Sequence, residues 1–162
     1  MDLIIESPKG SRAKYKYAEK NSLFRLHKLL PGALAFPFPF GFIPETKGED
    51  GDPLDAFILC EFEGFPGCIM DCRIIGCICA KQGDGQKMIR NDRFLAIPEQ
   101  SELFSNIISI DELEPTLVLF LENFLRVYQK LEGKEINLPG NLNSSSAMDL
   151  INKNKKNVYS FT

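Results

Sequence analysis

Short apolar and alternating segments separated by turn residues fill the first hundred positions of the chain, which predicts a series of short β-strands. Glycine and proline mark the turns, for example at 64–67, and 83–85 is expected to be an exposed loop. The expected strands cover residues 3–6, 14–17, 23–30, 55–62, 68–80 and 93–97.

The run Phe36-Pro37-Phe38-Pro39-Phe40-Gly41-Phe42 needs a separate interpretation. In an extended chain its four phenylalanines share one face. Its two prolines exclude a helix and a central strand with a complete hydrogen-bond ladder. The pattern predicts an edge or irregular extended segment that lines a cavity.

Helical spacing appears only late in the chain. Apolar residues recur every three or four positions from Leu117 to Leu131, with Pro115 suited to the first turn and Gly133 to the end. A capping-box pattern at 146–149 predicts a second, shorter helix. Many short strands followed by one long and one short helix predict a mainly β protein, a small barrel with the helices packed outside it.

Composition narrows the protein class. A chain of 162 residues with 44% apolar and 25% charged residues is expected to form one globular domain, residues 1–162. No apolar run approaches the roughly 20 residues of a membrane span. The acidic start of the chain does not resemble a targeting peptide, so the cytoplasm is the expected location and no membrane partner is expected. A net charge of −3 argues against a nucleic-acid partner.

The five cysteines contain no C-x-x-C pair, and His27 is the one histidine that could join them in a zinc site. An odd number of thiols without a framework spacing favours reduced cysteines. Cys77 and Cys79 alternate in an apolar run, so they should share one face of a strand and pack as small hydrophobes. A zinc site is the less favoured alternative. His27 is expected to pack on the side of its strand opposite to Lys28.

Charge is unevenly distributed. Basic residues crowd positions 9–28, whereas acids dominate positions 45–55 and end in Asp50-Gly51-Asp52-Pro53-Leu54-Asp55. Three carboxylates so close together repel one another unless cations neutralise them, and an all-oxygen ligand set selects Mg²⁺, Mn²⁺ or Ca²⁺ over zinc. The alternative is a solvated acidic turn, since Asp, Gly and Pro are common turn residues. The spacing does not fit an EF-hand.

The acidic segment and its flanks resemble the soluble (family I) inorganic pyrophosphatases. Residues 50–56, Asp-Gly-Asp-Pro-Leu-Asp-Ala, are similar to the signature of that family. Further segments are similar to other parts of the family pattern in the same order, namely 6–15, 36–44, 66–76, 91–98 and 128–134.

This resemblance implies an OB-like five-stranded barrel with one long and one short flanking helix. It implies hydrolysis of pyrophosphate to two phosphates with Mg²⁺, or with Mn²⁺, by a water that the metal activates. It also implies a homo-oligomer.

The resemblance assigns roles to individual residues. Asp50, Asp52 and Asp55 would bind metal, and Asp52 would be the catalytic base. Glu6 would hold an outer metal through water, and Asn91 would be a weak ligand. The phosphate contacts would come from four side chains, Lys14, Lys28, Arg93 and Tyr128.

The chain also departs from the family pattern. Asn91 stands where the family has an aspartate, Gln82 or Gly83 falls where an acidic pair is expected, and Lys16 replaces a glutamate. Lys28 replaces an arginine, Phe36 and Phe40 replace tyrosines, and Gln129 replaces a common lysine. Asp92 should point to the opposite face from Asn91, whereas Asp84 could swing in as a substitute ligand.

Two functions follow from these departures. The first is an active, divergent pyrophosphatase. The second is a weakened or inactive homologue that binds phosphate, pyrophosphate or a nucleotide. Hydrolysis of another phosphoanhydride is a third alternative.

Overall fold

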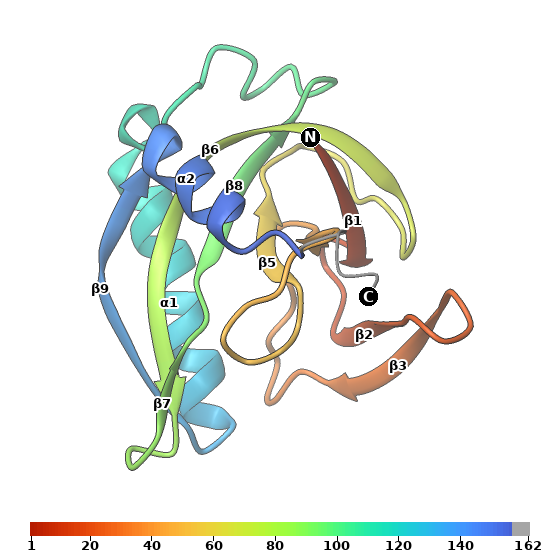
Figure 1. The fold of residues 1–162 in the computed structure, drawn as a ribbon, viewed down its shortest axis with the longest axis vertical. Helices are drawn as coiled ribbons and strands as arrows, with labels where there is room; N and C mark the ends of the chain where they lie inside the picture. The colour runs from red at the N-terminus through yellow and green to blue at the C-terminus, as the bar shows by residue number, and fades with distance from the viewer. Residues whose placement is uncertain (157–162) are drawn as a thin grey trace, which may run out of the picture.

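The computed structural model describes residues 1–156, in which nine strands, two α-helices and one short 3-10 helix follow one another along the chain (Figure 1). The strands are β1 Asp2–Ser7, β2 Ala13–Ala18, β3 Leu23–Leu29, β4 Phe40–Ile43, β5 Leu54–Ile58, β6 Ile69–Gly83, β7 Met88–Arg90, β8 Arg93–Pro98 and β9 Glu135–Asn143. The helices are η1 Ile110–Glu112, α1 Pro115–Leu131 and α2 Ser144–Lys153.

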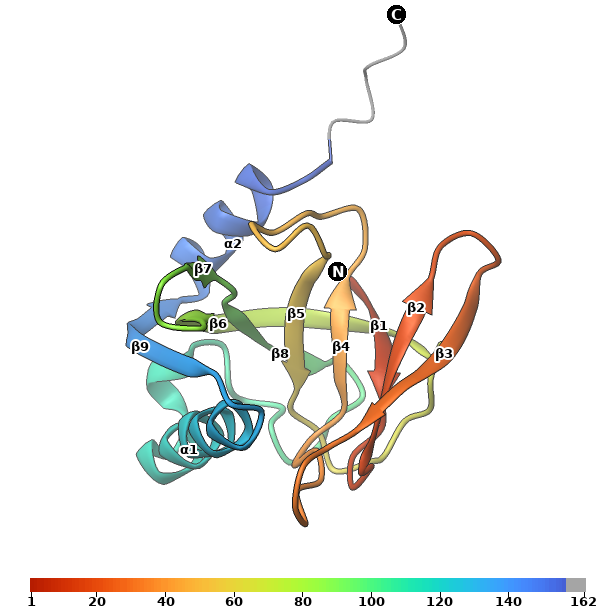
Figure 2. The same ribbon diagram turned by 90° about the horizontal axis from the view of Figure 1, so that it is seen from below.

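Five of these strands close into a ring. They pair in the order β1-β4-β5-β8-β6, and β6 returns to pair with β1. All pairs in the ring are antiparallel except β5 with β8. Strands β7 and β9 extend from β6, while β2 and β3 form a separate hairpin beside β1 and β4 (Figure 2). The predicted OB-like five-stranded barrel with two flanking helices is therefore confirmed.

Strand β8 shows why the ring strands are so apolar. Every residue from Arg93 to Pro98 is buried, because both faces of the strand are covered. Leu95 and Ile97 belong to the core that packs against α1. Phe94 and Ala96 belong to a second core that reaches α2. The alternation along one strand thus divides the interior into two apolar layers.

The long helix follows its predicted bounds. Pro115 occupies its first turn, and Gly133, with φ of 73°, follows its end. Its buried face includes Leu121, Phe124 and Tyr128, which face the first core. Within the described residues, no helix is both long and apolar enough to cross a membrane.

Several local predictions were wrong. The second helix begins at Ser144, and Asn143, not a residue of 146–149, accepts the capping hydrogen bond from the Ser146 N–H at 2.9 Å. Strand β4 is not an edge, since it pairs with both β1 and β5 once the prolines have ended. Strand β9 was not predicted, because its sequence is polar and contains Pro139. Only β6 pairs with it, so an edge position tolerates that proline.

Candidate active site

A cavity of about 810 Å³ lies where three distant segments meet, namely the hairpin β2–β3, the loop before β5, and the end of β6 with β7. Charged side chains line most of it. The acids are Glu6, Glu19, Asp50, Asp52, Asp55 and Asp84, and the lysines are Lys14, Lys16, Lys28, Lys47, Lys87, Lys134 and Lys156. Seven of the nine predicted site residues line this cavity, the exceptions being Arg93 and Tyr128.

The acidic loop, residues 50–55, is held open toward the cavity by its own backbone. Gly51 has φ of 87°, which an L side chain rarely adopts, and its N–H donates to the Gly48 carbonyl at 3.1 Å. The Asp52 N–H donates to Asp50 Oδ1 at 3.1 Å. Asp55 then enters β5, paired with Arg93 of β8. The loop thereby brings three carboxylates from six consecutive residues to one wall.

Two carboxylates of the cavity, Glu6 and Asp50, sit in surroundings that disfavour their charge. Burial raises the pKa of Glu6 to about 7, and the nearby Asp55 adds to the shift although the Tyr17 N–H donates to Glu6 Oε1 at 2.9 Å. Burial also raises the pKa of Asp50, with Asp55 and Asp52 contributing. A hard divalent cation with oxygen ligands would relieve this repulsion. The donor set therefore fits Mg²⁺ or Mn²⁺.

Three lysines of the β2–β3 hairpin line the same cavity and differ in their ion-pair partners. Lys16 Nζ lies 2.7 Å from Asp52 Oδ2, and Lys28 Nζ lies 2.8 Å from Glu132 Oε1. Lys14 makes no ion pair with any residue in the range 1–156, and its Nζ lies 5.9 Å from the Phe40 ring centroid. Burial lowers the pKa of Lys14. Lys14 is thus available to an anion in the cavity.

Arg93 lies behind the acidic loop. Its Nε is 3.7 Å from Asp55 Oδ2 and has no hydrogen-bond partner among the described residues. Its other nitrogens donate to Gln82 Oε1 at 3.1 Å and to the Asn91 carbonyl. Arg93 is only 4% exposed, so it supports the wall of the cavity from behind.

Tyr128 is also set back from the cavity. It is buried on α1, and Lys28 Nζ lies 5.5 Å from the centroid of its ring. Burial raises the pKa of Tyr128, while Lys28 acts in the opposite direction. Tyr128 therefore lies behind Lys28, which itself lines the cavity.

Comparison with known proteins identifies the family. The family model described as "Inorganic pyrophosphatase" matches residues 3–159. The chain belongs to the inorganic pyrophosphatase family. The inorganic pyrophosphatase of Methanosarcina acetivorans is 32% identical over 153 residues, which cover 94% of this chain and 89% of that protein. The inorganic pyrophosphatase of Streptomyces coelicolor is 35% identical over 136 residues, 83% of this chain and 81% of that protein. The solved inorganic pyrophosphatase of Helicobacter pylori superposes with a TM-score of 0.87 at 26% identity, covering 95% of this chain and 90% of that chain.

Residues 82–93, here called the returning strands, form another wall of the cavity and include the positions expected to depart from the pattern of the inorganic pyrophosphatase family. Asn91 lines the cavity. Asp92 does not, because its Oδ1 accepts from the Ala80 N–H at 2.9 Å and its Oδ2 pairs with Arg90 Nε at 2.6 Å. The prediction that Asp92 points away from Asn91 is confirmed.

The two other uncertain positions of this pyrophosphatase-family site also lie at the cavity. Gln82 lines it, with its Oε1 held by Arg93. Asp84 lies at the exposed rim, where its Oδ1 accepts from the N–H groups of Gln86 and Lys87 at 3.0 and 2.9 Å. Those bonds lower the pKa of Asp84 and hold it in a local turn. Asp84 therefore borders the cavity without joining the acidic loop.

The prediction that the phenylalanine run lines the cavity holds only in part. Phe42 lines the cavity, whereas Phe36 and Phe40 are buried in the core against α1, with ring centroids 5.2 Å apart. An apolar ring gains more from packing against that core than from a polar cavity. Phe36 and Phe40, where the resemblance implies tyrosines, thus contribute hydrophobic packing and no hydroxyl group.

His27 was expected to pack within the protein, and this prediction was wrong. A bulge pairs Lys14 with Lys28 but Tyr15 with Leu26, so His27 is the extra residue of β3. It is exposed and lines the cavity beside Lys28. Burial and the neighbouring lysines lower its pKa. Sequence spacing also missed the lining residues Lys47, Lys87 and Lys134, which lie on separate segments and carry no local motif.

Proposed function

We propose that this chain hydrolyses inorganic pyrophosphate to two phosphates, with Mg²⁺ as the metal and Mn²⁺ as an alternative. Its membership of the inorganic pyrophosphatase family supports the reaction. The observation that carries the proposal is the meeting, in one cavity, of the three acidic-loop carboxylates with the unpaired Lys14. Carboxylates suit a hard cation, and an ammonium group suits the phosphate oxygens that accompany it.

Metal binding is assigned to Asp50, Asp52 and Asp55, with Glu6 as an outer ligand and Asn91 as a weak one. A divalent ion held there would supply Lewis-acid chemistry, activating water and neutralising phosphate charge. The raised pKa of Glu6, to about 7, implies that a cation entering beside it displaces a proton from the carboxyl group.

Asp52 is the proposed catalytic base. Its Oδ2 is bound by Lys16, so Oδ1 is the oxygen that would accept the proton of the attacking water. General-base catalysis needs a carboxylate held within hydrogen-bond reach of that water. The ion pair with Lys16 keeps Asp52 oriented while it leaves one oxygen for this purpose.

The phosphate contacts are assigned to Lys14, Lys28 and Tyr128, as the family resemblance implies. Lys14 needs no exchange of partner, whereas Lys28 must share its charge between Glu132 and the substrate. Arg93 is proposed to act from behind, by fixing Asp55 at the cavity wall, with its Nε directed at that carboxylate.

A second function is favoured by a specific group of observations. Lys16 already neutralises Asp52, and the returning strands offer the neutral amides Asn91 and Gln82 to the cavity. A chain with fewer strong metal ligands could bind phosphate, pyrophosphate or a nucleotide without turning it over. Both functions allow pyrophosphate to bind, and turnover distinguishes them.

Assembly and location are further parts of the proposal. The exposed apolar residues Leu119 and Phe120 on α1 support a homo-oligomer. All five cysteines are free, which supports a reducing compartment such as the cytoplasm.

The test is phosphate release from pyrophosphate during Mg²⁺ and Mn²⁺ titrations, with Asp55→Asn beside the wild type. We expect metal-dependent turnover that falls by roughly 10²–10³-fold in Asp55→Asn, because several kcal/mol of charge stabilisation are lost. Asp149→Asn on the exposed surface of α2 is the matched control and should be unaffected. Calorimetric pyrophosphate binding without turnover by the wild type would instead support the second function.

A further inference from the structure

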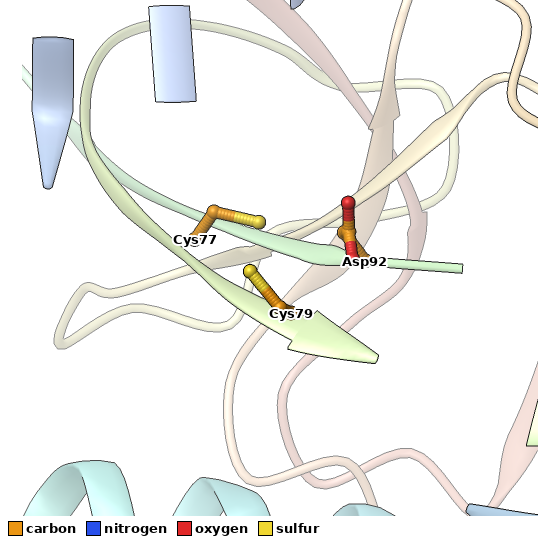
Figure 3. Close-up of side chains that lie close together, drawn as sticks. All are labelled: Cys77, Cys79 and Asp92. Carbon is orange, nitrogen blue, oxygen red and sulfur yellow. The ribbon is translucent and has the colours of Figure 1, made fainter. Parts of the chain in front are cut away.

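Two thiols and a carboxylate converge outside the acidic cavity. Cys77 and Cys79 project from the same face of β6, and Asp92 immediately precedes β8 (Figure 3). The two Sγ atoms and a carboxylate oxygen of Asp92 lie within 4.8 Å of one another. None of these three side chains lines the large cavity.

The spacing of these atoms is close to that of a metal site. Tetrahedral zinc, with bonds of about 2.3 Å to sulfur and about 2.0–2.2 Å to oxygen, places neighbouring ligand atoms about 3.5–3.8 Å apart. The three atoms would therefore need to approach one another by about 1.3 Å or less. Two sulfur ligands select a soft cation, whereas the oxygen ligands of the large cavity select Mg²⁺.

Neighbouring groups already orient the carboxylate of Asp92 and balance its charge. The Ala80 N–H donates to Asp92 Oδ1, the kind of outer contact that fixes a metal ligand. Arg90 Nε lies 2.6 Å from Asp92 Oδ2, so a guanidinium now provides the positive charge at the edge of the cluster. The hydrogen bond between the two thiols, followed by burial, raises the pKa of Cys77, and the same hydrogen bond lowers the pKa of Cys79.

Open space borders the carboxylate end of the cluster. A small cavity of about 100 Å³ is lined by both Asp92 and Arg90. On the other side of the cluster, Cys79 is only partly buried, and its β9 partner is Gly140. A side chain added at Gly140 would meet no atom within 4 Å at its first carbon, so this neighbour does not obstruct Cys79.

We propose that Cys77, Cys79 and Asp92 form a second metal site, which takes a thiophilic divalent cation such as Zn²⁺. Three protein ligands leave a position for water or another small ligand, so the site is of the open kind. The ion competes with Arg90 for Asp92, and its binding releases protons from the thiols. Asp92 lies between Asn91, which lines the large cavity, and Arg93, which lies near Asp55.

The experiment uses the reduced full-length protein in saturating Mg²⁺, with Cd²⁺ as the spectroscopic probe and Zn²⁺ as competitor. Thiolate-to-cadmium charge transfer absorbs in the ultraviolet, which carboxylate ligands do not reproduce. We expect one Cd²⁺ per chain, displaced by Zn²⁺. Cys79→Ser should weaken binding by about 10–100-fold or more, since even outer-contact changes cost that much.

Two further variants are expected to differ in their affinity for Cd²⁺. Cys68→Ser removes a thiol elsewhere and should leave Cd²⁺ binding unchanged, whereas Arg90→Gln removes the competing cation and should tighten it. A second measurement needs no substitution at the buried Cys77. Zn²⁺ should slow alkylation of Cys79 in the wild type by about tenfold or more, as mapped by mass spectrometry.

The proposal is overturned by any of three results. The first is the absence of a charge-transfer band, and the second is a band that Cys79→Ser does not diminish. The third is alkylation of Cys79 at the same rate with and without Zn²⁺. None of these results depends on pyrophosphate turnover, so the metal site and the proposed function can fail separately.

Discussion

The two walls of the large cavity differ in how they carry charge. The acidic loop presents three carboxylates within six residues, and two of them, Asp52 and Asp55, are balanced by cations from other segments. The returning strands present the amides of Asn91 and Gln82, while Asp92 is turned away and paired with Arg90, and Asp84 stays at the rim in a local turn. Under the proposed function, the acidic loop would bind metal strongly and the returning strands weakly.

The neutral amides leave the fold of the barrel intact. Arg93 holds both positions, by donating to the main-chain carbonyl of Asn91 and to the side chain of Gln82. The barrel depends on the apolar faces of β5 and β8, to which neither residue belongs. Metal affinity and substrate binding therefore can change while the architecture stays the same.

Among the tests that compare the two walls, the largest effect is expected from the anion side of the cavity. Lys14 lies near both Asp55 and Arg93, which influence its pKa from the two walls. Lys14→Met should lower kcat/KM for pyrophosphate by about 10²–10³-fold, the cost of losing one preorganised donor. Steady-state phosphate release measures this. Lys20→Met, on the exposed surface, is the control, and equal losses in the two variants would remove Lys14 from the site.

A second test uses the pH dependence of stability. The folded pKa of Glu6, about 7, exceeds its ordinary 4.5, so between these values the folded protein holds a proton that the unfolded chain has released. The free energy of unfolding should fall as pH rises through this window, by about 3 kcal/mol in total. Glu6→Gln should abolish that fall.

Urea unfolding at pH 5 and pH 8 with a chelator measures this effect, and Glu63→Gln, an exposed glutamate, is the control. Added Mg²⁺ should restore stability at pH 8 in the wild type but less in Glu6→Gln. If the wild type and Glu6→Gln lose the same free energy of unfolding between the two pH values, the pKa of Glu6 is not raised in the folded protein.

The weaker wall can be strengthened directly. Asn91→Asp adds a carboxylate where the family has one, and the Mg²⁺ concentration for half-maximal activity should fall about tenfold, equivalent to about 1.4 kcal/mol. A Mg²⁺ titration of turnover measures the change, with the exposed Asn141→Asp as control. An unchanged Mg²⁺ requirement would mean that the charge at position 91 does not limit metal binding by the returning strands.

The smallest effect concerns Lys16. The side chains of Lys16 and Asp52 are 45% and 50% exposed, and an ion pair so accessible to water contributes about 0.2–1 kcal/mol. Lys16→Met should therefore lower the half-saturating Mg²⁺ concentration by at most about fivefold, because Mg²⁺ no longer competes with the ammonium group. Direct Mg²⁺ binding by calorimetry checks this, and weaker binding in Lys16→Met would show that Lys16 supports the metal site instead.

The sequence predicted the barrel because its strands and long helix have strong periodic patterns. The apolar run that became β8 and the helical spacing from Leu117 to Leu131 reflect burial, which hydrophobicity reports directly. The acidic loop was predicted because its residues are consecutive. Features that depend on contacts between distant segments were harder to predict.

Three features show what the sequence patterns could not predict. The bulge that turns His27 to the cavity depends on pairing with β2, and no residue in β3 signals it. Strand β9 exists because β6 provides an edge, although its own sequence is polar. The setback of Arg93 behind Asp55 depends on the parallel register of β5 and β8. Each is decided by tertiary packing, which overrides local preference.

The central claim is that the acidic loop catalyses hydrolysis of pyrophosphate, and phosphate release by Asp52→Asn at saturating Mg²⁺ tests it most directly. The substitution keeps the shape of the side chain and removes the proposed base. The account predicts a metal-dependent wild-type activity and a kcat about 10²–10⁴-fold lower in Asp52→Asn. Equal turnover by the two proteins, or no metal-dependent turnover by the wild type, would contradict it.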